Sequence, residues 1–161
     1  MMRRVVDTNV AVVANGRETT ATAKCQLACL AQLRKILDEG GIVIDDAGDI
    51  LKEYRRYLSP SGQPGVGDRF FREILVNFTG KVQRVHLAKT SDGSYADFPD
   101  DARLAAFDTS DRKFAAAARR AVMPVLNATD SDWLDHREAL AENGIAVEFV
   151  CGCKAACWFA D

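Results

Sequence analysis

Short apolar segments that are typical of buried strands alternate with helical segments along the whole chain. The predicted strands span residues 3–6, 42–44, 82–87, 124–127 and 145–150. The predicted helices span residues 25–39, 47–58, 102–107, 111–121 and 131–143, and one more helix follows Asp68 and carries Phe71, Ile74, Leu75 and Phe78. Strands separated by helices indicate a parallel sheet covered on both faces.

The size and composition of the chain fit a single domain with a normal core. It has 161 residues, of which 48% are hydrophobic and 27% are charged, so we expect one domain over residues 1–150 and a Cys-containing tail over residues 151–161. We find no segment of about 20 apolar residues and no signal-like N-terminus, which predicts a cytoplasmic protein without a membrane segment. The net charge of −2 gives no global basic field, although three pairs of adjacent arginines could form local basic patches.

The five cysteines do not form an obvious framework. Cys25 and Cys29 are four residues apart on a predicted helix, and the tail contains Cys151, Cys153 and Cys157. An odd number without an export signal argues against a disulfide framework. The tail spacing could hold a soft metal, but no matching second Cys or His pair follows it. We therefore expect small buried side chains or a loose tail.

Acidic residues follow two of the predicted strands and are candidates for a shared site. Asp7 comes directly after the first strand, and Asp130 follows the fourth strand after a short turn. Ligand sites of parallel sheets lie at the carboxyl ends of the strands, so these two acids meet if their strands are neighbours. The alternative is that each acid only caps the helix that follows it, since Asp is favoured at that position.

Two further acids belong to helices. Glu53 lies beside the inward face of the helix over residues 47–58, where a carboxylate needs a metal or a cation, such as Arg55 or Arg56. Asp111 begins an Ala-rich helix, where the helix dipole favours an acid regardless of function. Four carboxylates at one sheet edge, without paired cations in their motifs, are typical of a site for Mg²⁺ or Mn²⁺, which prefer oxygen ligands.

The set of motifs resembles the PIN-domain family of metal-dependent ribonucleases over essentially the full length of the chain. Val5-Val6-Asp7-Thr8-Asn9 is similar to the opening strand and first acid of that family, and Glu53 matches its second acid. Asp111-Arg112-Lys113-Phe114 resembles the third motif, and Thr129-Asp130-Ser131-Asp132-Trp133 resembles the fourth. The resemblance implies a three-layer α/β/α sandwich with a central, mainly parallel five-stranded sheet.

The resemblance also implies a function and a set of roles. Asp7, Glu53, Asp111 and Asp130 would be the catalytic metal ligands, Asp132 an auxiliary ligand, and Asn9 and Thr129 supporting residues. The implied activity is Mg²⁺- or Mn²⁺-dependent endonucleolytic cleavage of RNA. Many small bacterial members are toxins held inactive by an antitoxin protein, and homodimers are common.

Two other functions stay open at this point. The first is a non-catalytic interaction module that uses the same fold, in which the acids would pair with internal Arg or Lys and bind no metal. The second is a hydrolase of small phosphate esters. It is less favoured because Asp7-Thr8-Asn9 has no second acid two residues after Asp7, which an aspartyl-phosphate enzyme would need as its acid catalyst.

Overall fold

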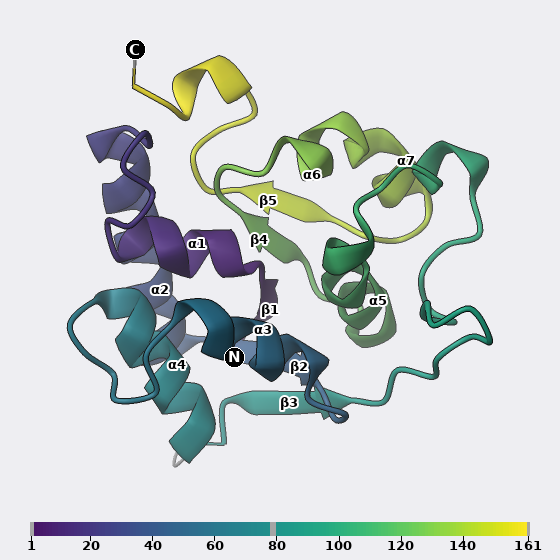
Figure 1. The fold of residues 1–161 in the computed structure, drawn as a ribbon, viewed down its shortest axis with the longest axis horizontal. Coiled ribbons are helices and arrows are strands. Elements are labelled where there is room, and N and C mark those ends of the chain that lie inside the picture. The colour runs from purple at the N-terminus through teal and green to yellow at the C-terminus, as the bar shows by residue number, and fades with distance from the viewer. Residues whose placement is uncertain (1, 78–79, 161) are drawn as a thin grey trace.

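Five parallel strands form one sheet in the part of the chain that the structure describes, residues 2–77 and 80–160 of a computed structural model (Figure 1). The strand order is β3-β2-β1-β4-β5. The strands are β1 (Arg3–Val6), β2 (Gly41–Asp45), β3 (Val82–Val85), β4 (Val125–Asn127) and β5 (Val147–Phe149). The predicted α/β class and the five-stranded parallel sheet are confirmed, and every strand pair is parallel.

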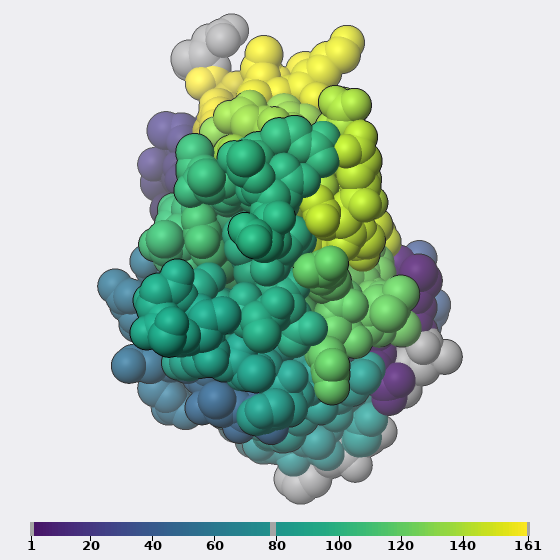
Figure 2. Space-filling view, turned by 90° about the vertical axis from the view of Figure 1, so that its right-hand side faces the viewer, coloured from purple at the N-terminus to yellow at the C-terminus, as the bar shows by residue number. Residues whose placement is uncertain are grey.

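The helices lie on both faces of this sheet. They are α1 (Thr8–Ala14), α2 (Ala23–Glu39), α3 (Asp49–Tyr57), α4 (Val66–Val76), α5 (Arg112–Ala121), α6 (Ser131–Asp135) and α7 (Arg137–Glu142), with 3-10 turns η1 (Ala102–Leu104), η2 (Thr109–Asp111) and η3 (Ala155–Cys157). Helices α1, α2 and α4 pack against one another on one side, and α5 contacts four strands from the other (Figure 1). The segment between β3 and α5 spreads over the side of the molecule shown in Figure 2.

Small side chains allow the closest approaches in this fold. Ala115, Ala116, Ala117 and Ala118 of α5 are fully buried, and their short side chains let this helix lie directly on the sheet. On the other side, a Cβ on Gly67 would lie 2.4 Å from the carbonyl oxygen of Ala11. Glycine is therefore required where α4 crosses α1, and this contact fixes the helix that carries the first acidic motif.

The structure differs from the expected element pattern in several places. Helix α1 was not predicted, because three valines within seven residues favour a strand. The helix expected over residues 131–143 is divided at His136, whose backbone leaves the helical region. The helix expected over residues 102–107 is only the short turn η1. Phe78, expected on the inner face of α4, lies outside the described residues.

The C-terminal tail is attached to the start of α2. A disulfide bond joins Cys25 to Cys151, so the expectation that the cysteines form no disulfide was wrong. Trp158 is fully buried, and its carbonyl accepts a hydrogen bond of 2.9 Å from the Thr22 amide. The tail is therefore packed and not loose, because it contains a large apolar side chain, Trp158, that is buried against the rest of the chain.

No helix among the described residues is long and apolar enough to cross a membrane.

Candidate metal centre

The two strands that end in acidic motifs are neighbours at the centre of the sheet. Strand β1 pairs with β4, with Val6 opposite Leu126. Asp7 follows β1 at once, and Asp130 follows β4 after a turn of two residues. The switch between the two halves of the sheet lies between these strands, where parallel sheets place their ligand sites. The two acids therefore reach the same pocket, as the strand pattern predicted.

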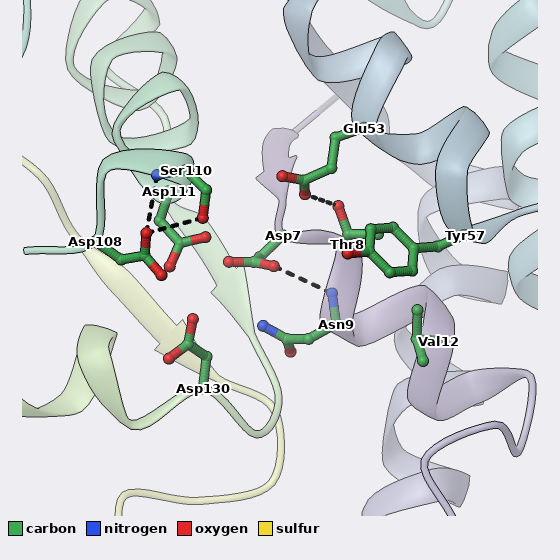
Figure 3. A pocket seen from close by; sticks show the side chains of 10 residues that line it. All are labelled: Asp7, Thr8, Asn9, Val12, Glu53, Tyr57, Asp108, Ser110, Asp111 and Asp130. Atoms are coloured by element: carbon green, nitrogen blue, oxygen red, sulfur yellow. Dashed lines mark hydrogen bonds between the residues drawn. The ribbon is translucent and has the colours of Figure 1, made fainter. Parts of the chain in front are cut away.

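Three aspartates converge at this edge. Asp7, Asp111 and Asp130 each offer a carboxylate oxygen, and these oxygens all lie within 4.8 Å of one another. Asp7 stands at the centre of the pocket, with Asp111 and Asp130 facing it from the other side of the sheet edge (Figure 3). The cavity has a volume of about 290 Å³ and is also lined by Asn9, Glu53 and Tyr57. Segments from the beginning, middle and end of the chain thus build one acidic pocket.

Asp7 has a structural and an electrostatic role at the same time. Its carboxylate caps α1 by accepting a hydrogen bond of 3.1 Å from the Asn9 amide. The other oxygen accepts a bond of 2.6 Å from Nε1 of the buried Trp133. Burial raises the pKa of Asp7 to about 7, although both hydrogen bonds act in the opposite direction. Asp7 therefore caps α1 and also belongs to the acidic pocket.

Asp111 is the least satisfied of the acids. Its Oδ2 is buried and has no hydrogen-bond partner within the described part of the chain. Burial, followed by the negative charge of Asp7, raises the pKa of this carboxyl to about 10. An unpaired carboxylate in such surroundings is costly unless a cation joins it. In the metal-free chain a proton meets this cost, and a cation in the pocket would meet it instead.

Glu53 lies on the opposite wall of the same pocket and has protein partners. It forms an ion pair of 2.7 Å with Lys113, and both side chains are largely buried. The hydroxyl of Thr8 also donates to it. The alternative of an ion pair with Arg55 or Arg56 was wrong, as was the expectation that the acidic motifs carry no paired cation, because Lys113 belongs to the third motif. This pair could not be predicted from the local sequence, because 60 positions separate Glu53 from Lys113.

Asn9 joins the first and fourth motifs. Its Nδ2 donates to Oδ1 of Asn127 at 2.9 Å, and its own Oδ1 accepts from the amides of Ala128 and Thr129 at 2.8 and 3.2 Å. Asn127 in turn accepts a bond of 3.2 Å from the Asp130 amide. The side-chain amide of Asn9 therefore fixes the turn that carries Asp130. Thr129 contributes its backbone to this arrangement.

Asp132, the expected auxiliary ligand, has other partners. Its Oδ2 accepts a hydrogen bond of 2.7 Å from the Asp108 amide, and its Oδ1 lies 3.2 Å from Nδ1 of His136. It is not among the residues that line the pocket. The structure thus gives Asp132 the task of holding the turn before α5, on which Asp108 and Asp111 are placed.

Sequence reasoning missed Asp108, which is both a capping residue and a pocket residue. It caps the turn η2, accepting from the Ser110 amide at 2.9 Å. It also lines the pocket beside Asp111 (Figure 3). The three-residue spacing from Asp108 to Asp111 was the available signal, because residues three apart in a 3-10 turn share one side.

The chemistry of the donors fits a hard divalent cation. The three converging groups are carboxylates, and no Lys, Arg or His forms an ion pair with Asp7, Asp111 or Asp130 among residues 2–77 and 80–160. Mg²⁺ and Mn²⁺ prefer such oxygen ligands and combine one or two carboxylates with water and phosphate. The unpartnered Oδ2 of Asp111 is the specific observation in favour of this fit.

The raised pKa values lead to a prediction for the metal-free protein. A carboxyl whose pKa is higher in the folded chain binds more protons when folded, so stability falls as pH rises above its unfolded pKa. For Asp7 the fall extends from about pH 4 to its folded pKa of about 7, and for Asp111 beyond pH 8. We expect the melting temperature in chelator to decrease between pH 5 and pH 8, and saturating Mg²⁺ to remove most of this decrease.

Thermal unfolding followed by circular dichroism at each pH provides the measurement. The double variant Asp7→Asn/Asp111→Asn is the control and should show a flatter profile in chelator. A wild-type melting temperature that stays constant or rises between pH 5 and pH 8 without metal would argue against mutual repulsion in the pocket.

Comparisons of the chain with family models, with curated proteins and with solved structures gave no match.

Proposed function

We propose that the chain is a divalent-metal-dependent endoribonuclease of the PIN type that hydrolyses RNA phosphodiester bonds. The observation that supports this proposal most is that three carboxylate oxygens converge within 4.8 Å and that the buried Oδ2 of Asp111 has no partner among the described residues. Such a cluster is unfavourable by itself, because like charges about 4 Å apart repel by roughly 4 kcal/mol at an effective dielectric constant near 20. A bound cation would attract each of the carboxylates and so offset their mutual repulsion.

The residues of the pocket would have different roles in this activity. Asp7, Asp111 and Asp130 would hold Mg²⁺ or Mn²⁺, which supplies an activated water and neutralises charge on the phosphate oxygens. Glu53 would complete the acidic wall, and its contacts with Thr8 and Lys113 keep its carboxylate directed into the pocket. Trp133 and the Asn9 amide orient Asp7, so that little rearrangement is needed when the substrate binds.

The other end of the pocket favours a nucleic acid over a small phosphate ester. Val12 and Tyr57 line it there, and the Tyr57 side chain faces the acids (Figure 3). Tyr57 is 46% exposed, and the Arg56 guanidinium lies 5.8 Å from its ring centre. An exposed aromatic ring beside arginine is suited to stacking with an unpaired base. A phosphate at the acids and a base on Tyr57 would match single-stranded RNA.

The alternative of a non-catalytic interaction module rests on one pair of residues. It expects the acids to pair with internal cations, and the Glu53–Lys113 ion pair meets this expectation. The three aspartates have no such partner among the described residues, which favours the metal-dependent enzyme. The wider parts of the proposal are a cytoplasmic location, a toxin role with a cognate antitoxin protein, and a homodimer. The toxin role and the homodimer follow from the family resemblance alone, and the cytoplasmic location follows from the sequence pattern.

The direct test is a cleavage assay with mixed single-stranded RNA oligomers. We expect cleavage with Mg²⁺ or Mn²⁺ and none with chelator. Equal cleavage in all three conditions would exclude a metal-dependent enzyme. Absence of cleavage together with absence of Mn²⁺ binding would favour the interaction module.

The stacking role of Tyr57 gives a separate prediction. Tyr57→Ala should weaken binding of a short single-stranded RNA by about tenfold, because stacking on one aromatic side chain contributes roughly 1–3 kcal/mol per base. Fluorescence anisotropy with Ca²⁺ in place of Mg²⁺ allows binding to be measured apart from cleavage. Tyr57→Phe, which keeps the ring, should bind within about twofold of wild type. Equal loss in both variants would mean that the hydroxyl group, and not stacking, accounts for the contact.

A further inference from the structure

Three cysteines from two separate segments lie close together, and none of them lines the acidic pocket. Cys25 and Cys29 belong to the first two turns of α2, and Cys151 follows β5. Their sulfur atoms all lie within 4.8 Å of one another. Cys25 and Cys151 form the disulfide bond, and Cys29 Sγ lies 3.9 Å from Cys151 Sγ. Cys29 is therefore left as a free thiol that is fully buried beside the disulfide.

The distance between Cys29 and Cys151 matches that of two ligands on one zinc ion. Two thiolates at about 2.3 Å from a tetrahedral Zn²⁺ are about 3.8 Å apart. The two segments also complete a spacing that the tail lacks by itself. Cys25 and Cys29 of α2 lie beside Cys151 and so provide a second cysteine pair in space. Pairs of cysteines from two segments are the usual composition of a structural zinc site.

A cavity beside two of these sulfurs leaves room for a fourth ligand. A cavity of about 120 Å³ is lined by Cys25, Cys151 and Cys157, together with Lys24 and Thr22. Cys157 ends the turn η3 and its side chain is exposed, so its sulfur can turn toward the cavity. Within the described chain, the residues that line this cavity include no carboxylate. Sulfur is thus the available metal ligand there.

The surroundings favour a thiolate at Cys25, whereas burial raises the pKa of Cys29 to about 12, so that a bound cation is needed for Cys29 to lose its proton. Cys25 lies in the first turn of α2, where Thr22 caps the helix and accepts from the Cys25 amide at 3.0 Å. The positive end of a helix dipole stabilises a thiolate. Lys24 adds a positive charge at the cavity. A zinc ion with four thiolates carries a net charge of −2, which these groups partly offset.

We propose that the reduced chain binds one Zn²⁺ through Cys25, Cys29, Cys151 and Cys157, and that this site and the Cys25–Cys151 disulfide exclude each other. A dithiol reductant converts the disulfide to two thiols and becomes a disulfide itself. The four thiols then release their protons to solvent as Zn²⁺ binds. In either state the tail is fastened to α2. This inference is independent of the nuclease proposal, because it involves none of the acidic residues.

Cobalt titration of the full chain tests the site. The protein is reduced with dithiothreitol, freed of reductant without air, and titrated with Co²⁺, whose sulfur-to-cobalt charge-transfer absorption arises only with thiolate ligands. We expect these bands to saturate at one Co²⁺ per chain and to disappear when Zn²⁺ is added. The oxidised protein should show none of them. Absence of the bands from the reduced wild type would overturn the proposal.

Single cysteine variants identify the ligands. Cys29→Ser and Cys157→Ser should each weaken Co²⁺ binding at least tenfold and change the bands, whereas Cys153→Ser should match wild type. Cys153 is the matched control because it is exposed and lies outside the cluster. Cys157 is also exposed, so its variant keeps the test valid if Cys29→Ser fails to fold. Unchanged bands in Cys157→Ser, or in a folded Cys29→Ser, would contradict the four-sulfur site.

Discussion

Replacing Asp111 with asparagine is expected to abolish RNA cleavage and to raise the melting temperature of the metal-free protein. Cleavage should fall by more than about a hundredfold, since even residues that only support metal ligands contribute roughly 10–100-fold. Stability should rise because burial raises the pKa of Asp111 to about 10, so the folded metal-free chain must keep this carboxyl protonated at pH 8 while the unfolded chain need not, and the variant removes this cost. Each unit by which the pKa of Asp111 is raised is equivalent to about 1.4 kcal/mol of stability. Removing one such unit would raise the melting temperature by roughly 3–6 °C for a chain of this size.

These opposite changes distinguish a metal ligand from a structural acid. The measurements are initial cleavage rates with Mg²⁺ and thermal unfolding in chelator at pH 8. Asp135→Asn is the control, because Asp135 is exposed on α6 and its replacement changes the net charge equally. It should leave both quantities nearly unchanged. Retained cleavage in Asp111→Asn, or a clear loss of metal-free stability, would contradict the assigned role.

Replacing Asn9 with alanine is expected to cause a large loss of stability. The change removes the acceptor for the Ala128 and Thr129 amides and the donor to Asn127. A buried group left without its partner costs about 1–3 kcal/mol, so we expect a total loss of about 2–4 kcal/mol. The turn that carries Asp130 should loosen as well, and cleavage should decrease together with stability.

Urea unfolding in chelator measures this loss without the contribution of bound metal. Gln26→Ala is the control, because the Gln26 amide makes no side-chain hydrogen bond within the described residues and lies on the neighbouring helix α2. It should change the free energy of unfolding by less than about 0.5 kcal/mol. A similarly small change in Asn9→Ala would show that Asn9 does not hold the first and fourth motifs together.

The sheet and the meeting of Asp7 with Asp130 could be predicted from sequence because both depend on local patterns. Val5-Val6 and Val125-Leu126 are short apolar runs, and an acid of the site follows each run within four positions. The parallel arrangement then brings the strand ends to one edge. Helix α1 could not be predicted in this way. Its valines favour a strand, and it forms because Asp7 caps it and because its buried side packs on α2 and α4.

The parts of the site that sequence did not reveal depend on contacts between distant segments. Lys113 reaches Glu53 across 60 positions, and Trp133 reaches Asp7 across 126. The Cys25–Cys151 disulfide also joins residues 126 positions apart. Neither partner of such a pair carries a local signal of the other. Tertiary packing alone decides these contacts, so a single sequence read segment by segment does not show them.

Calorimetric titration of the metal-free protein with Mn²⁺ tests most directly whether Asp7, Asp111 and Asp130 share a cation. The experiment compares wild type with Asp111→Asn under non-reducing conditions, in which the cysteine cluster remains oxidised. We expect saturable binding to wild type and binding at least tenfold weaker in the variant. No binding to wild type, or equal binding to both proteins, would contradict the shared metal centre.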